Sequence, residues 1–172
     1  IKTAGDIPSE SPPLSGSSET WNGTSWTEIT AMSSGRTNTA TGGTQTSCLV
    51  MGGAQVPANF GKVEEYNGST WSEVDDLNSP RSHFGAATDG TVASMICFGG
   101  TSQPGAVVQK VTEAYNGSTW SEIADQGTAT NYNTGGGSSS VAINCGGGPG
   151  ATDQIVEEWN ATGSSTVTFT SS

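Results

Sequence analysis

The fold of this chain is decided by a stretch of ten residues, Glu64-Glu65-Tyr66-Asn67-Gly68-Ser69-Thr70-Trp71-Ser72-Glu73. Nearly the same residues recur at 19–28 and 113–122, and an eroded copy begins at Glu157. The aromatic residue that opens each copy stands at positions 21, 66, 115 and 159, so the spacings are 45, 49 and 44 residues. A period of this length is typical of propellers, solenoids and other repeat arrays. The sequence therefore predicts a repeat protein.

Each full copy contains a strong signal for a β-hairpin. An Asn-Gly pair at 22–23, 67–68 and 116–117 separates the end of one aromatic strand from a Trp-bearing strand. Glycine accepts the positive φ that such a tight turn requires. We therefore expect two antiparallel strands in every copy, and a last strand without Trp over residues 165–169.

Two further strands are expected between successive hairpins. The second of them is apolar at successive positions, which indicates that both of its faces are covered, as happens when sheets stack face to face. In the third copy the leading Arg is missing, and Asn144 is aligned with Leu49 and Ile96. The paired segments are 36–43 with 47–53, 81–88 with 94–100, and 130–137 with 142–148. This gives three and a half repeats of four strands.

Composition agrees with an all-β chain and limits its partners. Only 31% of the 172 residues are apolar and 25 are Gly, which suits short strands and tight turns better than helices. Sixteen acidic against five basic residues give a net charge of -11, which repels nucleic acid and anionic membrane surfaces. No apolar run approaches the roughly 18 residues of a membrane span. We expect neither a nucleic-acid partner nor a membrane span.

The chain divides into an N-terminal segment and the repeats. Residues 1–16 contain Pro8, Pro12 and Pro13 among Gly and Ser, which predicts an extended arm or linker without a fold of its own. Residues 17–172 are predicted to be the repeats, with approximate limits 17–30, 31–76, 77–125 and 126–172. The first repeat would then leave the edge of its strand near Glu19 unpaired, an edge that needs a partner.

The three cysteines, Cys48, Cys97 and Cys145, are about 48 residues apart, which we interpret as corresponding buried strand positions. Disulfide frameworks are usually denser and even-numbered. No Cys-x-x-Cys spacing occurs and His83 is the only histidine, so neither a zinc site nor another cofactor is expected.

An Arg-led strand, a strand ending in Gly-Gly, a Glu-x-Tyr and a Trp at this spacing resemble the kelch repeat. The resemblance covers residues 17 to about 160 and is most specific at Pro80-Arg81-Ser82, Gly99-Gly100, Glu64, Tyr66 and Trp71. It implies β-propeller blades of four antiparallel strands. Propellers have roughly four to eight blades, so three and a half repeats imply a longer chain or several chains that share a ring.

The repeated charged and aromatic residues are interpreted as structural. Each Glu is expected to accept hydrogen bonds from turn amides of its own repeat or to pair with Arg36 or Arg81, although a ring of carboxylates that binds cations is an alternative. The aromatic residues are expected to pack within the repeats, with stacking on sugars as the alternative. The structural positions are Glu19, Glu64, Glu113, Glu157, Arg36, Arg81, Trp21, Trp26, Tyr66, Trp71, Tyr115, Trp120 and Trp159.

No catalytic residue set is predicted. Galactose oxidase is similar to kelch proteins, but its copper site needs two histidines, and this chain has His83 alone. No Gly-x-Ser-x-Gly turn that would present a serine nucleophile occurs. Connections that vary between repeats should gather on one face, where loops on a rigid scaffold commonly bind ligands. The candidate binding residues on that face are Asp75, Asp76, Gln103, Asp125 and Asp153.

These observations predict a non-catalytic structural or adhesive component of an extracellular assembly. Repeats of the Tyr-Asn-Gly-Ser-Thr-Trp type resemble those of phage and bacterial surface proteins, which implies a phage virion and a role as tail, fibre or surface protein. The expected partners are other subunits of the assembly, with a cell-surface glycan as a further candidate. The alternative is a secreted carbohydrate-binding module or a fragment of a larger carbohydrate-active enzyme.

Overall fold

The computed structural model describes residues 2–6, 14–55, 58–148, 155–160 and 163–166. These residues form nineteen strands and no helix, and every pairing between strands is antiparallel. The all-β class predicted from composition is confirmed.

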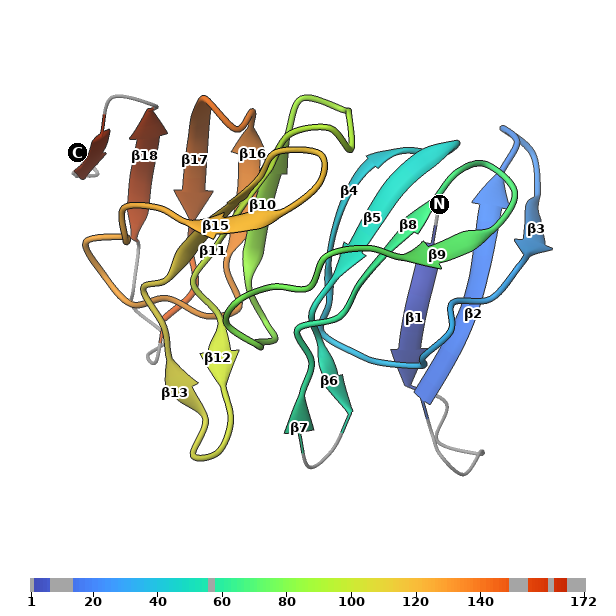
Figure 1. Ribbon diagram of the computed structural model, residues 1–172, viewed down its shortest axis with the longest axis horizontal. Helices are drawn as coiled ribbons and strands as arrows, with labels where there is room; N and C mark the ends of the chain where they lie inside the picture. Colours follow the sequence, from blue (N-terminus) through green and yellow to red (C-terminus); the bar gives the residue numbers. More distant parts are fainter. Residues whose placement is uncertain (1, 7–13, 56–57, 149–154, 161–162, 167–172) are drawn as a thin grey trace.

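Three four-stranded sheets form most of the molecule, and in each one the strands pair in the order in which the chain visits them. Figure 1 shows the sheets side by side along the molecule, in sequence order. We number them II to IV because a three-stranded sheet I precedes them. Sheet II contains β4 (Ala40–Thr44), β5 (Ser47–Met51), β8 (Val63–Tyr66) and β9 (Trp71–Glu73). Sheet III contains β10 (Gly85–Thr88), β11 (Met95–Phe98), β14 (Thr112–Tyr115) and β15 (Trp120–Glu122). Sheet IV contains β16 (Thr134–Gly137), β17 (Val141–Cys145), β18 (Val156–Asn160) and β19 (Gly163–Thr166).

Sheet I differs from the prediction for the N-terminal segment. It contains β1 (Lys2–Asp6), β2 (Leu14–Trp21) and β3 (Trp26–Ile29). Strand β1 pairs with β2, with Lys2 opposite Glu19, so the edge near Glu19 is covered. Residues 2–6 are extended, but they belong to sheet I, so the prediction of an arm or linker without a fold of its own is wrong for them. The prolines of the segment lie outside the described residues. Strand β1 therefore supplies one of the two strands that the half repeat lacks.

Two small hairpins connect the second and third strands of sheets II and III. They are β6 (Ala54–Gln55) with β7 (Ala58–Asn59), and β12 (Thr101–Ser102) with β13 (Val107–Val108). Both project from the same side of the molecule in Figure 1. Their bases are bridged to the connections between sheets, at Thr37 with Ala54 and at Ser82 with Thr101. The two kinds of variable connection therefore meet on one face, as the topology predicts.

The Asn-Gly turns fold as the sequence predicts. Asn67 Oδ1 accepts hydrogen bonds from the backbone N–H groups of Ser69 and Thr70, each at 3.0 Å, and Gly68 has φ +94°. Asn22 and Asn116 form equivalent turns. The asparagine side chain thus closes each hairpin locally.

Strand register corrects the predicted alignment of the repeats. Glu64 lies opposite Val50, Glu113 opposite Cys97 and Glu157 opposite Asn144. Asn144 therefore corresponds to Val50 and Cys97, and its alignment with Leu49 and Ile96 is wrong.

The same register shows that the three cysteines do not occupy one repeat position. Cys48 corresponds to Met95, and Cys145 to Phe98. All three thiols are free, and Cys48 and Cys97 are buried, as expected of small apolar strand residues. Burial raises the pKa of the Cys48 thiol to about 11.

The core lies between the facing sheets. Leu49, Met51 and Val63 of sheet II pack in one cluster with Met95 and Trp120 of sheet III. A second, smaller cluster joins residues of sheet III to Ala142 of sheet IV, with Trp159 packed against it. Strand β11 is covered on both faces because Met95 and Cys97 belong to the first cluster and Ile96 and Phe98 to the second, which agrees with its sequence pattern.

The same backbone hydrogen bond occurs between sheets II and III and between sheets III and IV. Gly53 N donates to Arg81 O at 2.9 Å, and Gly100 N donates to Thr130 O at 2.6 Å, so each Gly-Gly turn binds the connection that enters the next sheet. A side chain at Gly52 would meet the carbonyl oxygen of Arg81 at 2.6 Å. Close approach between sheets, together with φ +56°, therefore requires glycine at this position.

Candidate functional site

The repeated glutamates hold the connections between sheets. Glu113 accepts hydrogen bonds from Asn78 N at 2.8 Å and Ser79 N at 3.2 Å, and its carboxylate lies 3.2 Å from Arg81 Nη2. Glu64 is arranged in the same way, with Ser33 N at 2.7 Å and Arg36 Nη1 at 2.8 Å. Both arginines and both glutamates are almost completely buried. The interactions with turn amides and arginines expected from the sequence are present at these two positions.

Glu157 makes half of this arrangement. Its carboxylate accepts hydrogen bonds from Gly127 N and Thr128 N, each at 2.8 Å. Thr130 stands at the position of Arg36 and Arg81, so no cation faces this carboxylate from there. The hydrogen bonds from backbone N–H groups to the glutamate are therefore common to the three repeats, whereas the ion pair with arginine occurs in only two of them.

Polar side chains replace the arginine in the third connection. Asn144 Nδ2 lies 3.2 Å from Thr130 Oγ1 and 2.9 Å from the terminal amide of Gln126. Asn133 Nδ2 donates to Asn144 Oδ1 at 2.8 Å. These four residues are buried, and their hydrogen bonds compensate in part for the loss of hydration, although Asn133 Oδ1 has no hydrogen-bond partner among the described residues.

The repeated tryptophans have different environments. Trp26 is 50% exposed, Trp71 is partly buried and Trp120 is 4% exposed. Each lies beside the aromatic residue at the start of its hairpin, with ring centroids 5.5 Å apart for Trp21–Trp26, 5.1 Å for Tyr66–Trp71 and 4.9 Å for Tyr115–Trp120. The tryptophan of the aromatic pair becomes more buried from the first hairpin to the third. The second and third hairpins follow another sheet in the array, whereas the first hairpin belongs to sheet I. The N-terminal pair therefore presents two aromatic rings to solvent.

The predicted binding residues are not brought together as one site. Asp75 Oδ2 accepts a hydrogen bond from Trp120 N at 2.9 Å, and Asp76 Oδ1 accepts one from Val63 N at 3.3 Å. Gln103 lies between β12 and β13, before a cis peptide bond to Pro104. Asp125 lines the pocket described below, and Asp153 lies outside the described residues. Among the described residues, no group of three or more His, Cys, Asp or Glu could hold a metal ion.

Ser82 and His83 form the most nucleophile-like pair. Ser82 Oγ lies 2.9 Å from His83 Nδ1 and 3.3 Å from Asn59 Oδ1. Burial lowers the pKa of His83 below its usual value, so the ring is neutral at pH 7. Ser82 is only 2% exposed, and its backbone forms a β-bridge with Thr101. A buried hydroxyl cannot reach a substrate, and we assign this pair a structural role.

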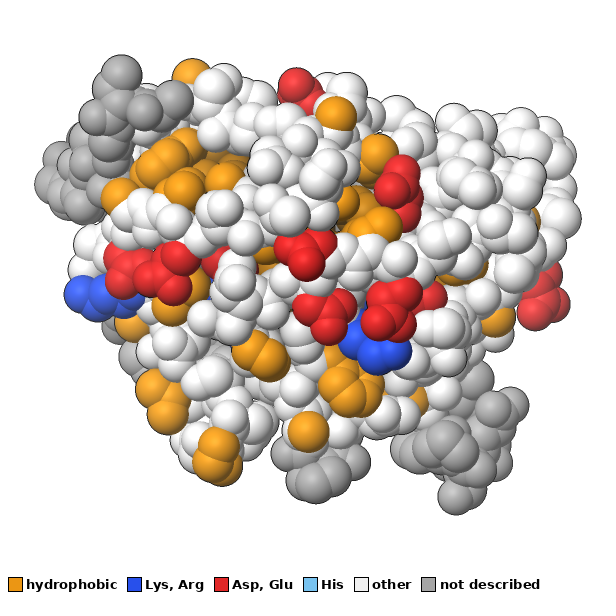
Figure 2. All heavy atoms as spheres, viewed as in Figure 1, with side chains coloured by type: hydrophobic (Ala, Val, Ile, Leu, Met, Phe, Trp, Pro, Cys, Tyr) orange, Lys and Arg blue, Asp and Glu red, His pale blue; other side chains and the backbone are white. Residues whose placement is uncertain are grey.

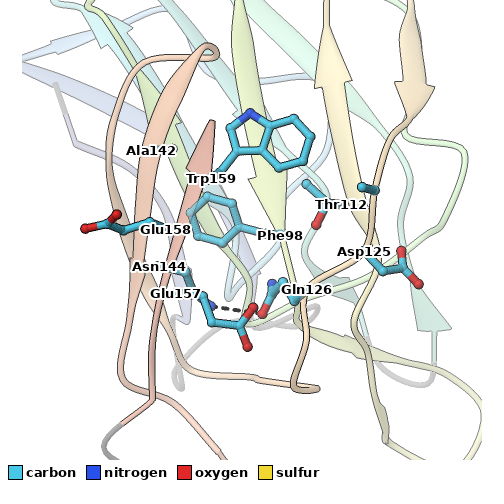
Figure 3. Close-up of a pocket in the computed structure, with 10 residues that line it drawn as sticks. Phe98, Thr112, Asp125, Gln126, Ala142, Asn144, Glu157, Glu158 and Trp159 are labelled. Carbon is cyan, nitrogen blue, oxygen red and sulfur yellow. Dashed lines mark hydrogen bonds between the residues drawn. The ribbon is translucent and has the colours of Figure 1, made fainter. Parts of the chain in front are cut away.

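A pocket lies between sheets III and IV. Figure 3 shows Trp159 above Phe98, with Gln126 and Glu157 below them. It is small, with a volume of about 20 Å³, and it is partly open to solvent. The lining residues are Phe98, Thr112, Ala124, Asp125, Gln126, Ala142, Asn144, Glu157, Glu158 and Trp159. Sequence reasoning did not predict this pocket, although the missing Trp of the last hairpin was a usable signal.

The surface is acidic, in agreement with the composition. Figure 2 shows carboxylate side chains distributed over one face and few basic groups among them. One of the basic groups, Lys62, is paired with Glu73 at 2.7 Å. The described part of the chain has no helix of the length and apolarity needed to cross a membrane.

Contacts that recur between sheets are incomplete at both ends of the array. No described atom lies within 4 Å of the position of a side chain at Gly146, whereas its counterparts Gly52 and Gly99 face the next connection at less than 3 Å. Tyr132, in the last connection, is 70% exposed. At the other end, sheet I contains three described strands where the other sheets have four.

No family model and no curated protein matches this chain.

Proposed function

We propose that this chain is a non-catalytic, kelch-like repeat protein that serves as a structural or adhesive component of an extracellular assembly, such as the tail, fibre or surface of a phage virion. In this proposal the four-stranded sheets are propeller blades. Further repeats, from the same polypeptide or from a neighbouring subunit, complete the ring or the assembly.

The unused contact positions at the ends support the proposal most directly. The junction between sheets II and III and the junction between sheets III and IV each bury a Gly-Gly turn against the following connection. Gly146 has the repeat position of Gly52 and Gly99, yet no described atom lies within 4 Å of a side chain placed there. Tyr132 has the repeat position of His83, and its side chain is exposed. An exposed surface of the kind that is buried elsewhere in the same array is suited to another repeat.

The acidic surface and the polar turns fit an extracellular role. A net charge of -11 favours solubility and repels nucleic acid. The candidate nucleophile is buried. These observations favour a scaffold over an enzyme.

Association in solution tests the assembly role. The 172-residue chain is expected to self-associate or to bind its neighbouring subunit in sedimentation velocity experiments. Tyr132→Asn should weaken that association, because it removes an exposed aromatic ring. The variant should fold, since Asn38 occupies the same repeat position with the same left-handed backbone, at φ 57° against 56° for Tyr132.

A folded monomer at all concentrations, unchanged by Tyr132→Asn and without affinity for virion components, contradicts the assembly role. Turnover of a galactoside in proportion to added copper contradicts the non-catalytic one.

The exposed Trp21–Trp26 pair favours carbohydrate binding as a second candidate function. Two tilted rings at a surface offer the apolar faces on which sugars stack. A glycan array probed with the wild type and with Trp26→Ala tests this candidate. Glycan binding that Trp26→Ala abolishes supports it, and the absence of binding to any glycan excludes it for this chain.

A further inference from the structure

The junction between sheets II and III is built from two different surfaces. The first is the forward face of sheet II, by which we mean the face turned toward the next sheet along the chain. The second is the aromatic pair of sheet III, the two rings opposite each other in its Asn-Gly hairpin. Leu49 and Met51 of the forward face are buried in one cluster with Tyr115 and Trp120 of the aromatic pair. A complete junction therefore needs both surfaces.

Sheet IV ends the array with a forward face that no described sheet covers. Strand register places Ile143 at the position of Leu49 and Cys145 at the position of Met51. Leu49 and Met51 are fully buried, whereas Ile143 and Cys145 are only partly buried. Val141 lies on the same side of β17 and is 64% exposed. The apolar face that is covered in sheet II is therefore accessible in sheet IV.

Sheet I begins the array with an aromatic pair that packs on no described forward face. Trp21 lies opposite Trp26, as Tyr115 lies opposite Trp120. Trp21 is 42% exposed and Trp26 is 50% exposed, whereas both rings of the Tyr115–Trp120 pair are buried. The ring centroids of the exposed pair are 5.5 Å apart, close to the 4.9 Å of the buried pair. The exposed pair thus already has the arrangement of a pair in a complete junction.

We propose that a second copy of this chain covers these surfaces, with the Trp21–Trp26 pair of one copy packed on the forward face of sheet IV of the other. This inference rests on the assembly role proposed above and names the partner. One chain contains both halves of a junction, and Figure 1 shows sheets I and IV at opposite ends of the molecule. The contact is heterologous, so it closes into a ring or extends as a filament according to the rotation between copies.

The acidic residue on the forward face of sheet IV is compatible with this contact. Glu158 lies opposite Ile143, as Glu65 lies opposite Leu49 in sheet II. Burial raises the pKa of Tyr115, and the nearby charge of Glu65 raises it further. An acidic residue at this position is therefore present in the complete junction as well. The net charge of -11 opposes association over longer distances, and salt at about 0.15 M screens it beyond about 8 Å.

Two variants that each block one end test the proposal by sedimentation velocity at that salt concentration. Trp26→Glu places a charge in the aromatic pair, and Val141→Glu places one on the forward face of sheet IV. Both native side chains are at least half exposed, so both variants should keep the strand spectrum in circular dichroism. The wild type should associate, and each variant alone should associate about tenfold more weakly or less, because buried aromatic anchors dominate such contacts.

A mixture of the two variants gives the sharper result. Each variant retains the end that the other lacks, so an equimolar mixture should form a dimer and nothing larger. Contacts between two like ends cannot produce this pattern. A variant that associates alone as tightly as the wild type overturns the proposal, and so does a mixture that stays monomeric when the wild type associates.

Val107→Glu is the matched control. Val107 is 54% exposed in the hairpin of β12 and β13, which projects from the side of the array and not from its ends. This variant should associate as the wild type does, and a loss as large as that in Val141→Glu overturns the proposal. If a charged variant does not fold, Trp26→Ala and Val141→Ser replace the pair. Serine suits this strand position because Ser94 occupies it in sheet III.

The behaviour of the wild type separates this inference from the assembly role. A wild type that stays monomeric at every concentration excludes the second copy. If that monomer binds a different component of the native particle, the assembly role stands and only the identity of the partner is wrong. If it binds none, both proposals are wrong.

Discussion

The junction between sheets II and III and the junction between sheets III and IV have the same backbone design but different contents. Both are held by a glutamate that accepts hydrogen bonds from the connection between the sheets, and both place a Gly-Gly turn against the next connection. The first also contains the buried Arg81–Glu113 ion pair and an apolar cluster. The second contains Thr130 and a network of amides beside an incompletely filled pocket. The backbone contacts therefore specify the junction, and the side chains between the sheets can vary in charge and volume.

This difference explains why the last repeat is hard to recognise in the sequence. Gly and Glu, which make the backbone contacts, are present in both junctions, whereas Arg, Met and Trp of the first junction are replaced by other residues in the second. Buried amides can replace an ion pair only where they form hydrogen bonds with one another, because each buried polar group without a partner costs about 1–3 kcal/mol of stability. The comparison can be tested by changing equivalent positions in the two junctions.

The largest effect is expected from Arg81→Ala. Removal of the guanidinium leaves Glu113 as a buried charge without its cation, which should lower the free energy of unfolding by about 3–5 kcal/mol. The matched change in the other junction is Thr130→Ala, which removes a neutral hydroxyl and should cost about 1 kcal/mol. Urea denaturation of both variants measures the difference. Equal losses would show that the ion pair contributes no more than the amide network.

The tryptophans should form a graded series. Trp120→Ala removes a fully buried ring and should cost about 3–5 kcal/mol. Trp71→Ala should cost less because its ring is partly exposed, and Trp26→Ala, at the surface, should change stability by less than about 0.5 kcal/mol. Thermal denaturation of the three variants gives the order. A Trp26→Ala variant as unstable as Trp120→Ala would mean that another segment covers Trp26 in solution.

A smaller effect is expected within the amide network. Gln126→Leu introduces the counterpart of Leu77 but leaves Asn144 with one hydrogen-bond partner fewer, and it should cost about 1–3 kcal/mol. Adding Asn144→Cys, which introduces the counterpart of Cys97, should recover part of that loss. A double-mutant cycle measures the coupling. Strict additivity would show that the two amides stabilise the junction independently.

The smallest effect concerns pH. Burial lowers the pKa of His83, so the unfolded state takes up a proton first as the pH falls. The stability from the neutral ring is complete above the unfolded pKa of about 6.5 and declines below it. His83→Asn, which introduces the residue that Asn38 provides at the same repeat position, should remove this decline between about pH 8 and pH 5.5. Chemical denaturation at several pH values checks it, and identical pH profiles would assign the decline to other groups.

Much of the fold could be predicted from the sequence because its strongest signals are local. The Asn-Gly pairs specify the hairpins, and the runs of successive apolar residues indicate strands that are covered on both faces. The pairing of Glu64 with Arg36 and of Glu113 with Arg81 followed from their recurrence at the repeat period. These features depend on residues within one repeat.

The errors come from features that depend on neighbouring repeats. The predicted alignment of the three cysteines was wrong. Equivalent strand positions are those opposite the repeated glutamates, namely Val50, Cys97 and Asn144, and the spacing of the cysteines in the sequence does not follow them. Strand β1 was missed because Lys2–Asp6 contains Gly5 and precedes a proline-rich run. Identical hairpin motifs also could not reveal how exposed Trp26 and Trp120 are, since exposure depends on what covers them. The pocket is lined by Ala142 where the other junction has Met95, and only the strand register relates these two residues.

The backbone hydrogen bonds between sheets have a mechanical consequence. His83 N donates to Asn38 O, and Tyr132 N donates to His83 O, so each bond joins a sheet connection to the next one in sequence order. A load applied along the array would therefore detach one sheet at a time, because neighbouring repeats are the units that interact. Each detachment would release one repeat of about 45 residues, a length on the order of 150 Å when extended. In a fibre or tail, such stepwise yielding would let the chain absorb a pull while the remaining sheets stay folded.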